Sequence, residues 1–121
     1  KRTFHDKIIY KNLKNIFLFK NIFFNPLHIS TLSELIVSNI KKYKNDTYNL
    51  GSKNKISKSD FIIKLCKNLK LNRTFSIINY SSKFIRRPLD MTMNINKITR
   101  LLKIKKYDVN SELLKLFNEY K

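Results

Sequence analysis

The stretch that decides the fold runs from Ile16 to Ile40 and reads IFLFKNIFFNPLHISTLSELIVSNI. Its first four residues, Ile16–Phe19, are β-branched or aromatic, and such a run predicts a short buried strand. Asn25-Pro26 then interrupts a second apolar stretch, and because proline cannot donate to a strand ladder we expect an extended connection there. Thr31, followed three residues later by a glutamate, forms a capping box and predicts the start of a helix.

Helices and strands alternate through the rest of the chain. Apolar spacing and capping residues predict helices over 4–13, 31–43 and 94–102 and after the caps Ser57 and Asp108, and strands over 16–19, 47–50 and 74–80. Such alternation favours a parallel sheet covered by helices, and a right-handed crossover would make 16–19 and 47–50 parallel neighbours. The predicted fold class is therefore α/β, with about three short strands and a helix-rich C-terminus.

Length and composition exclude several kinds of protein. The 121 residues suit one domain or part of one, and because no strand precedes the first helix we expect residues 1–121 to be a single partial domain. One cysteine excludes a disulfide framework, and one glycine excludes a Walker or dinucleotide-binding loop, which needs several positions without a Cβ. No apolar run could span a bilayer and no signal-peptide core follows Lys1-Arg2, so we expect a cytoplasmic protein without a membrane partner.

The net charge of +18, from 26 Lys and Arg against 8 Asp and Glu, raises the question of a polyanionic partner. The chain also contains 21 Lys, 15 Asn and 16 Ile, which share A/T-rich codons, and this indicates compositional drift. The lysines are spread evenly along the sequence, whereas a nucleic-acid binder usually concentrates them on one face. We therefore expect no specific nucleic-acid partner.

Few residues have the pattern of a catalytic or metal site. Tyr10 and Lys14 show the Y-x-x-x-K spacing of a catalytic phenol and its ammonium partner, but chance explains this spacing in so lysine-rich a chain, and we interpret Tyr10 as a helix-surface residue. His28 is predicted to be a satisfied core histidine, and Cys66 to pack as a small hydrophobe. His5 and His28 stand apart from any carboxylate cluster, so we predict no metal site and no catalytic residue.

Arg86-Arg87-Pro88 is the strongest candidate for a binding site. Two guanidinium groups in a loop suit a diphosphate, because each planar fork can meet two phosphate oxygens at once. Pro88 fixes its own φ angle and stiffens the loop. We therefore predict that Arg87 and Arg86 contact the substrate.

Four blocks of the sequence resemble a known family. They are Asn25-Pro-Leu-His-Ile29, Tyr48-Asn-Leu-Gly-Ser52, Ser57-Lys-Ser-Asp-Phe61 and Arg87-Pro-Leu-Asp-Met91. In this order and spacing they are similar to the C-terminal, substrate-binding half of extended short-chain dehydrogenase/reductases. The nearest group is the dTDP-4-dehydrorhamnose reductase-like sugar-nucleotide reductases.

The resemblance implies a Rossmann-type NAD(P)-binding parent protein, an oxidoreductase that uses NADPH or NADH to reduce a 4-keto sugar nucleotide. It implies that this chain is the C-terminal part of that parent, with the cofactor-binding half absent. The family's cofactor loop and Tyr/Lys pair lie upstream of the region resembled, so the chain alone is expected to bind no cofactor and to be inactive. Arg87 matches the family's R-P position, which implies a contact with the nucleotide-sugar substrate. The full-length parent is also compatible with a homodimer.

A second interpretation remains open: a small basic RNA- or ribosome-associated binding protein from an A/T-rich genome. That function expects aromatic rings interleaved with lysines on an exposed face, where bases can stack. The phenylalanines instead fall mostly on apolar stripes or strands, which favours the first interpretation. The upstream reading frame discriminates between the two, since only a reductase should encode a glycine-rich loop and a Y-x-x-x-K pair there.

Overall fold

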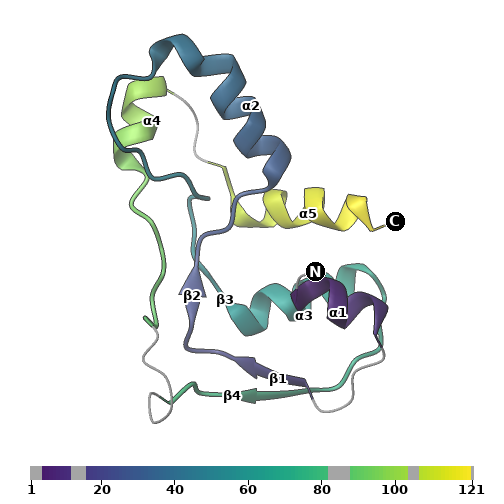
Figure 1. The fold of residues 1–121 in the computed structure, drawn as a ribbon. Helices are drawn as coiled ribbons and strands as arrows, with labels where there is room; N and C mark the ends of the chain where they lie inside the picture. Colours follow the sequence, from purple (N-terminus) through teal and green to yellow (C-terminus); the bar gives the residue numbers. More distant parts are fainter. Residues whose placement is uncertain (1–3, 12–15, 82–87, 104–106, 121) are drawn as a thin grey trace.

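A computed structural model describes residues 4–11, 16–81, 88–103 and 107–120 of the 121-residue chain. It confirms the α/β class, with short strands and helices mixed along the sequence (Figure 1). The elements are α1 (Phe4–Tyr10), β1 (Ile16–Phe19), β2 (Phe23–Phe24), α2 (Ile29–Asn39), the 3₁₀ turn η1 (Ile40–Lys42), β3 (Ile56–Ser57), α3 (Lys58–Asn68), β4 (Phe75–Ile78), α4 (Asn96–Leu102) and α5 (Val109–Glu119). None of the helices within the described ranges is long and apolar enough to cross a membrane.

The strands form two small sheets, and one predicted pairing is wrong. β1 pairs in parallel with β4, with Ile16 opposite Phe75, while β2 pairs antiparallel with β3. Residues 47–50, predicted as the parallel neighbour of β1, do not form a strand. Tyr48 and Leu50 instead pack their side chains against the cluster around α4, and the backbone N–H of Ser52 bonds to the carbonyl of Asn25 at 3.3 Å. The parallel neighbour of β1 is therefore β4 and not residues 47–50.

Two of the predicted helix caps are confirmed. The Ser57 hydroxyl accepts the backbone N–H of Asp60 at 3.0 Å, and the Asp108 carboxylate accepts that of Asn110 at 2.8 Å. Each side chain satisfies one of the unpaired N–H groups that every helix has in its first turn. These two caps fix where α3 and α5 begin.

The predicted cap at Thr31 is wrong, because α2 begins two residues earlier at Ile29. His28 has an extended backbone conformation, and its Nδ1 accepts the N–H of Ser30 at 3.2 Å. Thr31 therefore lies inside the first turn and is fully buried. The His28 imidazole satisfies a first-turn N–H group of a helix that begins before Thr31, so Thr31 does not act as the cap.

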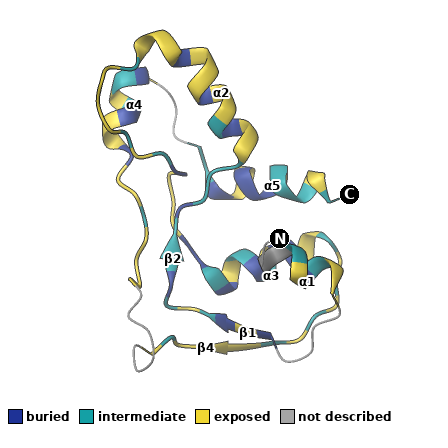
Figure 2. Cartoon of the chain, viewed as in Figure 1, coloured by how far each residue is buried: buried dark blue, intermediate teal, exposed yellow. Residues whose placement is uncertain are grey.

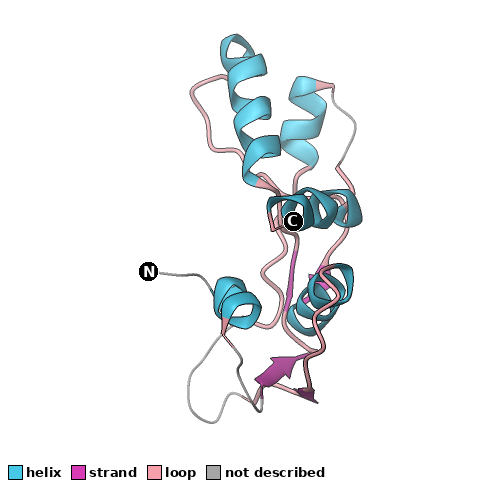
Figure 3. Cartoon of the chain, turned by 90° about the vertical axis from the view of Figure 1, so that its right-hand side faces the viewer, coloured by secondary structure: helices cyan, strands magenta, loops and turns pink. Residues whose placement is uncertain are grey.

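Buried side chains form three clusters that follow the arrangement of the elements. In Figure 1, α3 and α1 lie over the β1–β4 pair, and α5 lies between them and the paired helices α2 and α4; Figure 3 shows the same arrangement from the side. The clusters contain Ile8, Ile16, Leu18, Ile62 and Cys66; Leu35, Ile95, Ile98 and Leu102; and Ile56, Val109 and Leu113. Cys66 is 3% exposed and burial raises the pKa of its thiol, which confirms that it packs as a small hydrophobe.

Asn25 joins three distant segments at the centre of the chain. Its side-chain N–H₂ donates to the carbonyls of Ser52 at 3.1 Å and Met93 at 3.0 Å, and its side-chain oxygen accepts the N–H of Met93 at 2.9 Å. Gly51 lies so close that a Cβ there would stand 2.6 Å from the Asn25 amide nitrogen and 2.9 Å from the Asn25 carbonyl oxygen. The only glycine of the chain thus serves this close approach.

We predict that Gly51→Ala destabilises the protein by about 1–3 kcal/mol, because the added methyl group overlaps Asn25 and must displace it. Urea unfolding of the variant against wild type measures the loss, and Asn49→Ala, an exposed position in the same segment, is the matched control. In an Asn25→Ala background the Gly51→Ala penalty should shrink, since the amide is gone and only the backbone carbonyl remains in the way. Equal penalties in both backgrounds would contradict this account.

Candidate functional site

Asn25 bonds to Ser52, the last residue of the block that begins at Tyr48, and to Met93, two residues after the block that begins at Arg87. Asp90 and Met91 of that last block contact Phe23, two residues before Asn25. Beside Asn25 lies a hollow of about 300 Å³. Its lining consists of Phe24, Asn25, Pro26, Leu27, Leu32, Leu50, Met91 and Met93. Asn25 is the one polar side chain in this lining, and its amide is already bonded to the backbone. The hollow therefore offers apolar contact and no acid or base.

The segment from Pro88 to Met93 is held along β2. The N–H of Phe23 donates to the carbonyl of Leu89 at 2.7 Å, and the N–H of Met91 donates back to the carbonyl of Phe23 at 2.9 Å. With the bonds between Asn25 and Met93, these contacts fix the backbone directly after the predicted Arg-Pro loop. Arg86 and Arg87 themselves lie outside the described residues, so their predicted substrate contacts stay predictions.

Asp90 lies within this segment and anchors it to Lys55, the residue directly before β3. One carboxylate oxygen lies 2.7 Å from Lys55 Nζ, and the other accepts the Thr92 N–H at 3.0 Å and the Thr92 hydroxyl at 2.5 Å. The bond from Lys55, followed by those from Thr92, lowers the pKa of Asp90 from 3.8 to about 2. Lys55 also lies 4.7 Å from the centre of the Phe23 ring, so one ammonium ties β2 to residue 90.

A second, more polar hollow of about 550 Å³ opens beside α4. Lys97 spans its wall: its Nζ lies 2.5 Å from the Asp46 carboxylate, 3.1 Å from the Thr47 carbonyl and 5.1 Å from the centre of the Tyr48 ring. The bond from Lys97 lowers the pKa of Asp46. Lys44 and Arg100 also line this hollow and give it a net positive charge, which suits an anionic group.

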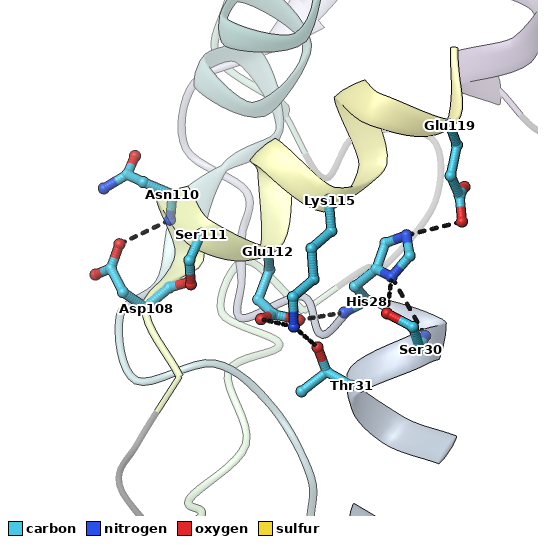
Figure 4. Close-up of polar contacts among 9 residues, drawn as sticks. All are labelled: His28, Ser30, Thr31, Asp108, Asn110, Ser111, Glu112, Lys115 and Glu119. Carbon is cyan, nitrogen blue, oxygen red and sulfur yellow. Dashed lines mark hydrogen bonds and ion pairs between the residues drawn. The ribbon is translucent and has the colours of Figure 1, made fainter. Parts of the chain in front are cut away.

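Figure 4 shows the polar contacts that join α2 to α5. The His28 side chain is 8% exposed; its Nδ1 lies 2.7 Å from the Ser30 hydroxyl and its Nε2 lies 3.0 Å from a Glu119 oxygen. The prediction of a buried histidine is confirmed; Nδ1 is hydrogen-bonded, whereas the contact of Nε2 with Glu119 does not have the geometry of a hydrogen bond. The added finding is that His28 both caps α2 and reaches the far end of α5.

Glu112 is the main residue that sequence reasoning missed. It is 3% exposed, accepts the backbone N–H of His28 at 2.8 Å and lies 3.3 Å from Lys115 Nζ, which also bonds to the Thr31 hydroxyl. A carboxylate in the first turn of a helix is ordinarily a surface group that favours the helix dipole. The sequence signal was the lysine three residues later, which supplies the opposite charge that a buried carboxylate requires.

Tyr10 is 61% exposed, which confirms its interpretation as a helix-surface residue; its ring centre lies 6.1 Å from that of Tyr120. Lys14 and the side chain of His5 lie outside the described residues. Within the described ranges, no group of three His, Cys, Asp or Glu side chains could hold a metal ion.

Comparison with known proteins gives a fold but no sequence match. No protein-family model and no curated protein sequence matches the chain. Three solved dTDP-4-dehydrorhamnose reductases share its fold. The protein from Bacillus anthracis, solved in complex with NADP, has a TM-score of 0.84 at 18% identity over 100% of this chain; that from Yersinia enterocolitica has 0.81 at 18% over 100%; and that from Clostridium acetobutylicum has 0.77 at 15% over 99%.

This chain spans 44% of the length of each of these reductases, less than half. At 15–18% identity the likeness establishes a shared fold, that of part of a Rossmann-like reductase. The resemblance predicted from the four sequence blocks is thereby confirmed at the level of the fold.

We predict that Asp90→Asn destabilises the protein at neutral pH and that this difference from wild type disappears as the pH falls toward 2. A carboxyl whose pKa is lower in the folded than in the unfolded protein stabilises the fold above its unfolded value, near 3.8, and loses that effect as it is protonated. Thermal unfolding of both proteins between pH 7 and 2 gives the comparison. Lys55→Met should show the same loss at neutral pH, and the double variant should lose no more than either single one. A difference that persists at pH 2 would contradict the assignment.

Proposed function

We propose that the chain is the substrate-side part of an NAD(P)H-dependent reductase that acts on a 4-keto sugar nucleotide. The observation that carries the proposal is the likeness of the whole chain to 44% of three dTDP-4-dehydrorhamnose reductases. The contacts around Asn25 and Phe23 support it, because they place side by side the blocks that begin at Asn25, Tyr48 and Arg87, which resemble the substrate-binding half of such enzymes.

The β1–β4 pair supports the proposal that this chain packs against a further part of the protein. Parallel sheets occur almost only where both faces are covered, and a two-stranded sheet alone is marginal. α1 and α3 cover one face of this pair, whereas Phe17 and Ile78 on the other face are 58% and 39% exposed. A cofactor-binding part of Rossmann type would continue the sheet and cover this face.

The chain's own residues do not fit a dinucleotide. A pyrophosphate loop needs several glycines so that the backbone can approach the phosphates. The one glycine here, Gly51, faces the Asn25 side chain, and its missing Cβ makes room for that amide. The proposal therefore assigns cofactor binding and the transfer of hydride and proton to the further part, and assigns substrate contact to this chain.

Arg87 and Arg86 are the proposed substrate contacts. They directly precede Pro88, where the segment bonded to β2 begins. A backbone fixed at that point lowers the conformational entropy lost when a guanidinium binds a diphosphate, and the planar guanidinium can donate hydrogen bonds to two phosphate oxygens at once. The apolar hollow beside Met91 and Met93 then offers a surface for the face of a sugar or a base.

The alternative, a basic RNA-binding protein, finds less support. Base stacking needs free aromatic faces beside lysines. Three aromatic rings, those of Phe23, Tyr48 and Tyr107, each already have a lysine ammonium of this chain 4.7–5.5 Å from the ring centre. We therefore propose that nucleic-acid binding by the chain is weak and has a shallow salt dependence.

The test of substrate contact uses the protein encoded by the complete reading frame, in which we expect a glycine-rich loop and a Y-x-x-x-K pair upstream. The 121-residue chain alone should show no turnover with NADPH and a 4-keto sugar nucleotide. In the complete protein, Arg87→Lys should lower kcat/KM. The corresponding loss of transition-state stabilisation should be on the order of 1–3 kcal/mol, the cost of losing a charge-assisted hydrogen bond. Tyr10→Phe, the control, should change it by no more than a few tenths of a kcal/mol. A silent Arg87→Lys with an inactive Tyr10→Phe would refute the assignment.

The covered sheet face gives a second, independent test. In the complete protein Phe17→Lys should lower the free energy of unfolding by more than about 3 kcal/mol, because it buries a charge without a partner. The control is Leu114→Lys on α5, where the wild-type residue is 54% exposed, and it should cost less than about 0.5 kcal/mol. Equal effects of the two variants would show that nothing covers the outer face of the β1–β4 pair.

A further inference from the structure

The hollow beside α4 gathers positive side chains that are only partly neutralised. Its lining contains Lys44, from the segment after η1, and Lys97 and Arg100, from α4. Asp46 is the one acidic residue among the described residues of this lining, and its carboxylate pairs with Lys97 at 2.5 Å. No carboxylate of the described residues forms an ion pair with Lys44 or Arg100. Two positive charges at one hollow therefore lack a counter-charge within the described ranges.

Helix α4 fixes the wall from which two of these cations project. Ile98 and Leu102 of α4 are buried in a core cluster, whereas Lys97 and Arg100 are exposed, and Figure 2 shows both buried and exposed residues on this helix. Residues three apart in a helix are neighbours on its surface, so Lys97 and Arg100 point to the same side. The core thus holds the two cations on one wall, and an anion can meet both without a rearrangement of the backbone.

The same hollow offers a neutral hydrogen-bond donor beside the cations. Asn94, also in the lining, uses its side-chain oxygen to accept the backbone N–H of Asn96 at 3.0 Å. Its N–H₂ group has no partner among the described residues and is left as a donor. Ammonium, guanidinium and amide N–H₂ groups only donate hydrogen bonds, and phosphate oxygens only accept them. The chemistry of this lining therefore suits a phosphate group.

We propose that this hollow binds a small molecule that carries a phosphate or diphosphate group, with Lys44, Lys97 and Arg100 as its cationic contacts. The planar guanidinium can donate to two oxygens of one phosphate, and each ammonium can donate to others. The volume of about 550 Å³ is that of a small-molecule site and leaves room for an apolar part of the ligand beside Tyr48 and Leu101. The proposal rests on described residues alone and does not depend on the proposed reductase function.

Asp46 competes with such a ligand for Lys97. One of its carboxylate oxygens pairs with the ammonium that a phosphate would bind, and its negative charge repels a phosphate. The other oxygen accepts the backbone N–H of Thr47 at 2.7 Å, a bond that an asparagine can keep. Asp46→Asn should therefore strengthen phosphate binding without altering the segment. A residue that only supported the fold would have the opposite effect, so the sign of this change is informative.

Protection of individual lysines from acetylation tests the proposal in the protein encoded by the complete reading frame. The probe is inorganic pyrophosphate, with the ionic strength held constant by NaCl, and mass spectrometry measures the acetylation of each lysine. Because the contacts are exposed to solvent, half-maximal protection of Lys44 should need a concentration on the order of 1 mM. Lys67, an exposed lysine of α3 outside this lining, is the internal control and should stay unprotected.

Three variants give distinct expected results for the protection of Lys44. Arg100→Gln should raise the half-maximal concentration about fivefold, and Asp46→Asn should lower it about twofold. Arg87→Lys should leave it unchanged, which separates this site from the proposed substrate contact. The proposal is overturned by equal protection of Lys44 and Lys67, by no protection at about 20 mM pyrophosphate, by a silent Arg100→Gln or by weaker binding in Asp46→Asn. Loss of the protection in Arg87→Lys would assign the anion to the arginine pair and also overturns it.

Discussion

The side-chain amide of Asn25 is the interaction on which the rest of the structure depends. It makes three hydrogen bonds to the backbone of Ser52 and Met93, which are 27 and 68 residues away in the sequence. Each of these backbone groups is partly or wholly removed from water, and leaving one unpaired would cost about 1–3 kcal/mol. The amide therefore fixes the course of the segment after the arginine pair, and with it the wall of the apolar hollow that Met91 and Met93 line.

The few acidic residues serve more to fix the positions of particular lysine side chains than to neutralise the positive charge of the chain. Lys55, Lys97 and Lys115 each lie between a carboxylate and an aromatic ring, the carboxylates being Asp90, Asp46 and Glu112. A ring face attracts a cation and a carboxylate fixes its direction, so each of these lysine side chains is held between two groups. In a lysine-rich chain, this is an economical way to give a common residue a defined place.

Local features of the fold could be predicted from the sequence, and the long-range ones could not. Ser57 and Asp108 mark their helices correctly because a cap acts over three residues. The prediction of a cap at Thr31 was wrong because His28, three residues earlier and directly before α2, is the cap. The strand expected at 47–50 does not form: Tyr48 and Leu50 pack against the cluster around α4, and Ser52, two residues after this segment, bonds to Asn25, which are contacts that no local pattern encodes. The lone glycine was the available signal for the candidate site, since a single Gly51 in such a chain marks a place where a Cβ cannot fit. The burial of Glu112 beside Lys115 could not be predicted from hydrophobic periodicity either, because periodicity shows which face of a helix is apolar and not whether a charged residue is buried.

The pairing of β1 with β4 has a consequence for how the chain folds. Ile16 meets Phe75 only after α2, β3 and α3 have been made, so the contact order of this sheet is high and its closure is slow. On a ribosome that synthesises about 5–20 residues per second, the strand IFLF waits several seconds for its partner. During that interval, four consecutive apolar residues with high β propensity would tend to pair with strand edges of other chains. Lys14 and Lys20 bracket the strand in sequence, and such flanking charges act as gatekeepers that keep a nascent strand from aggregating until its own partner arrives.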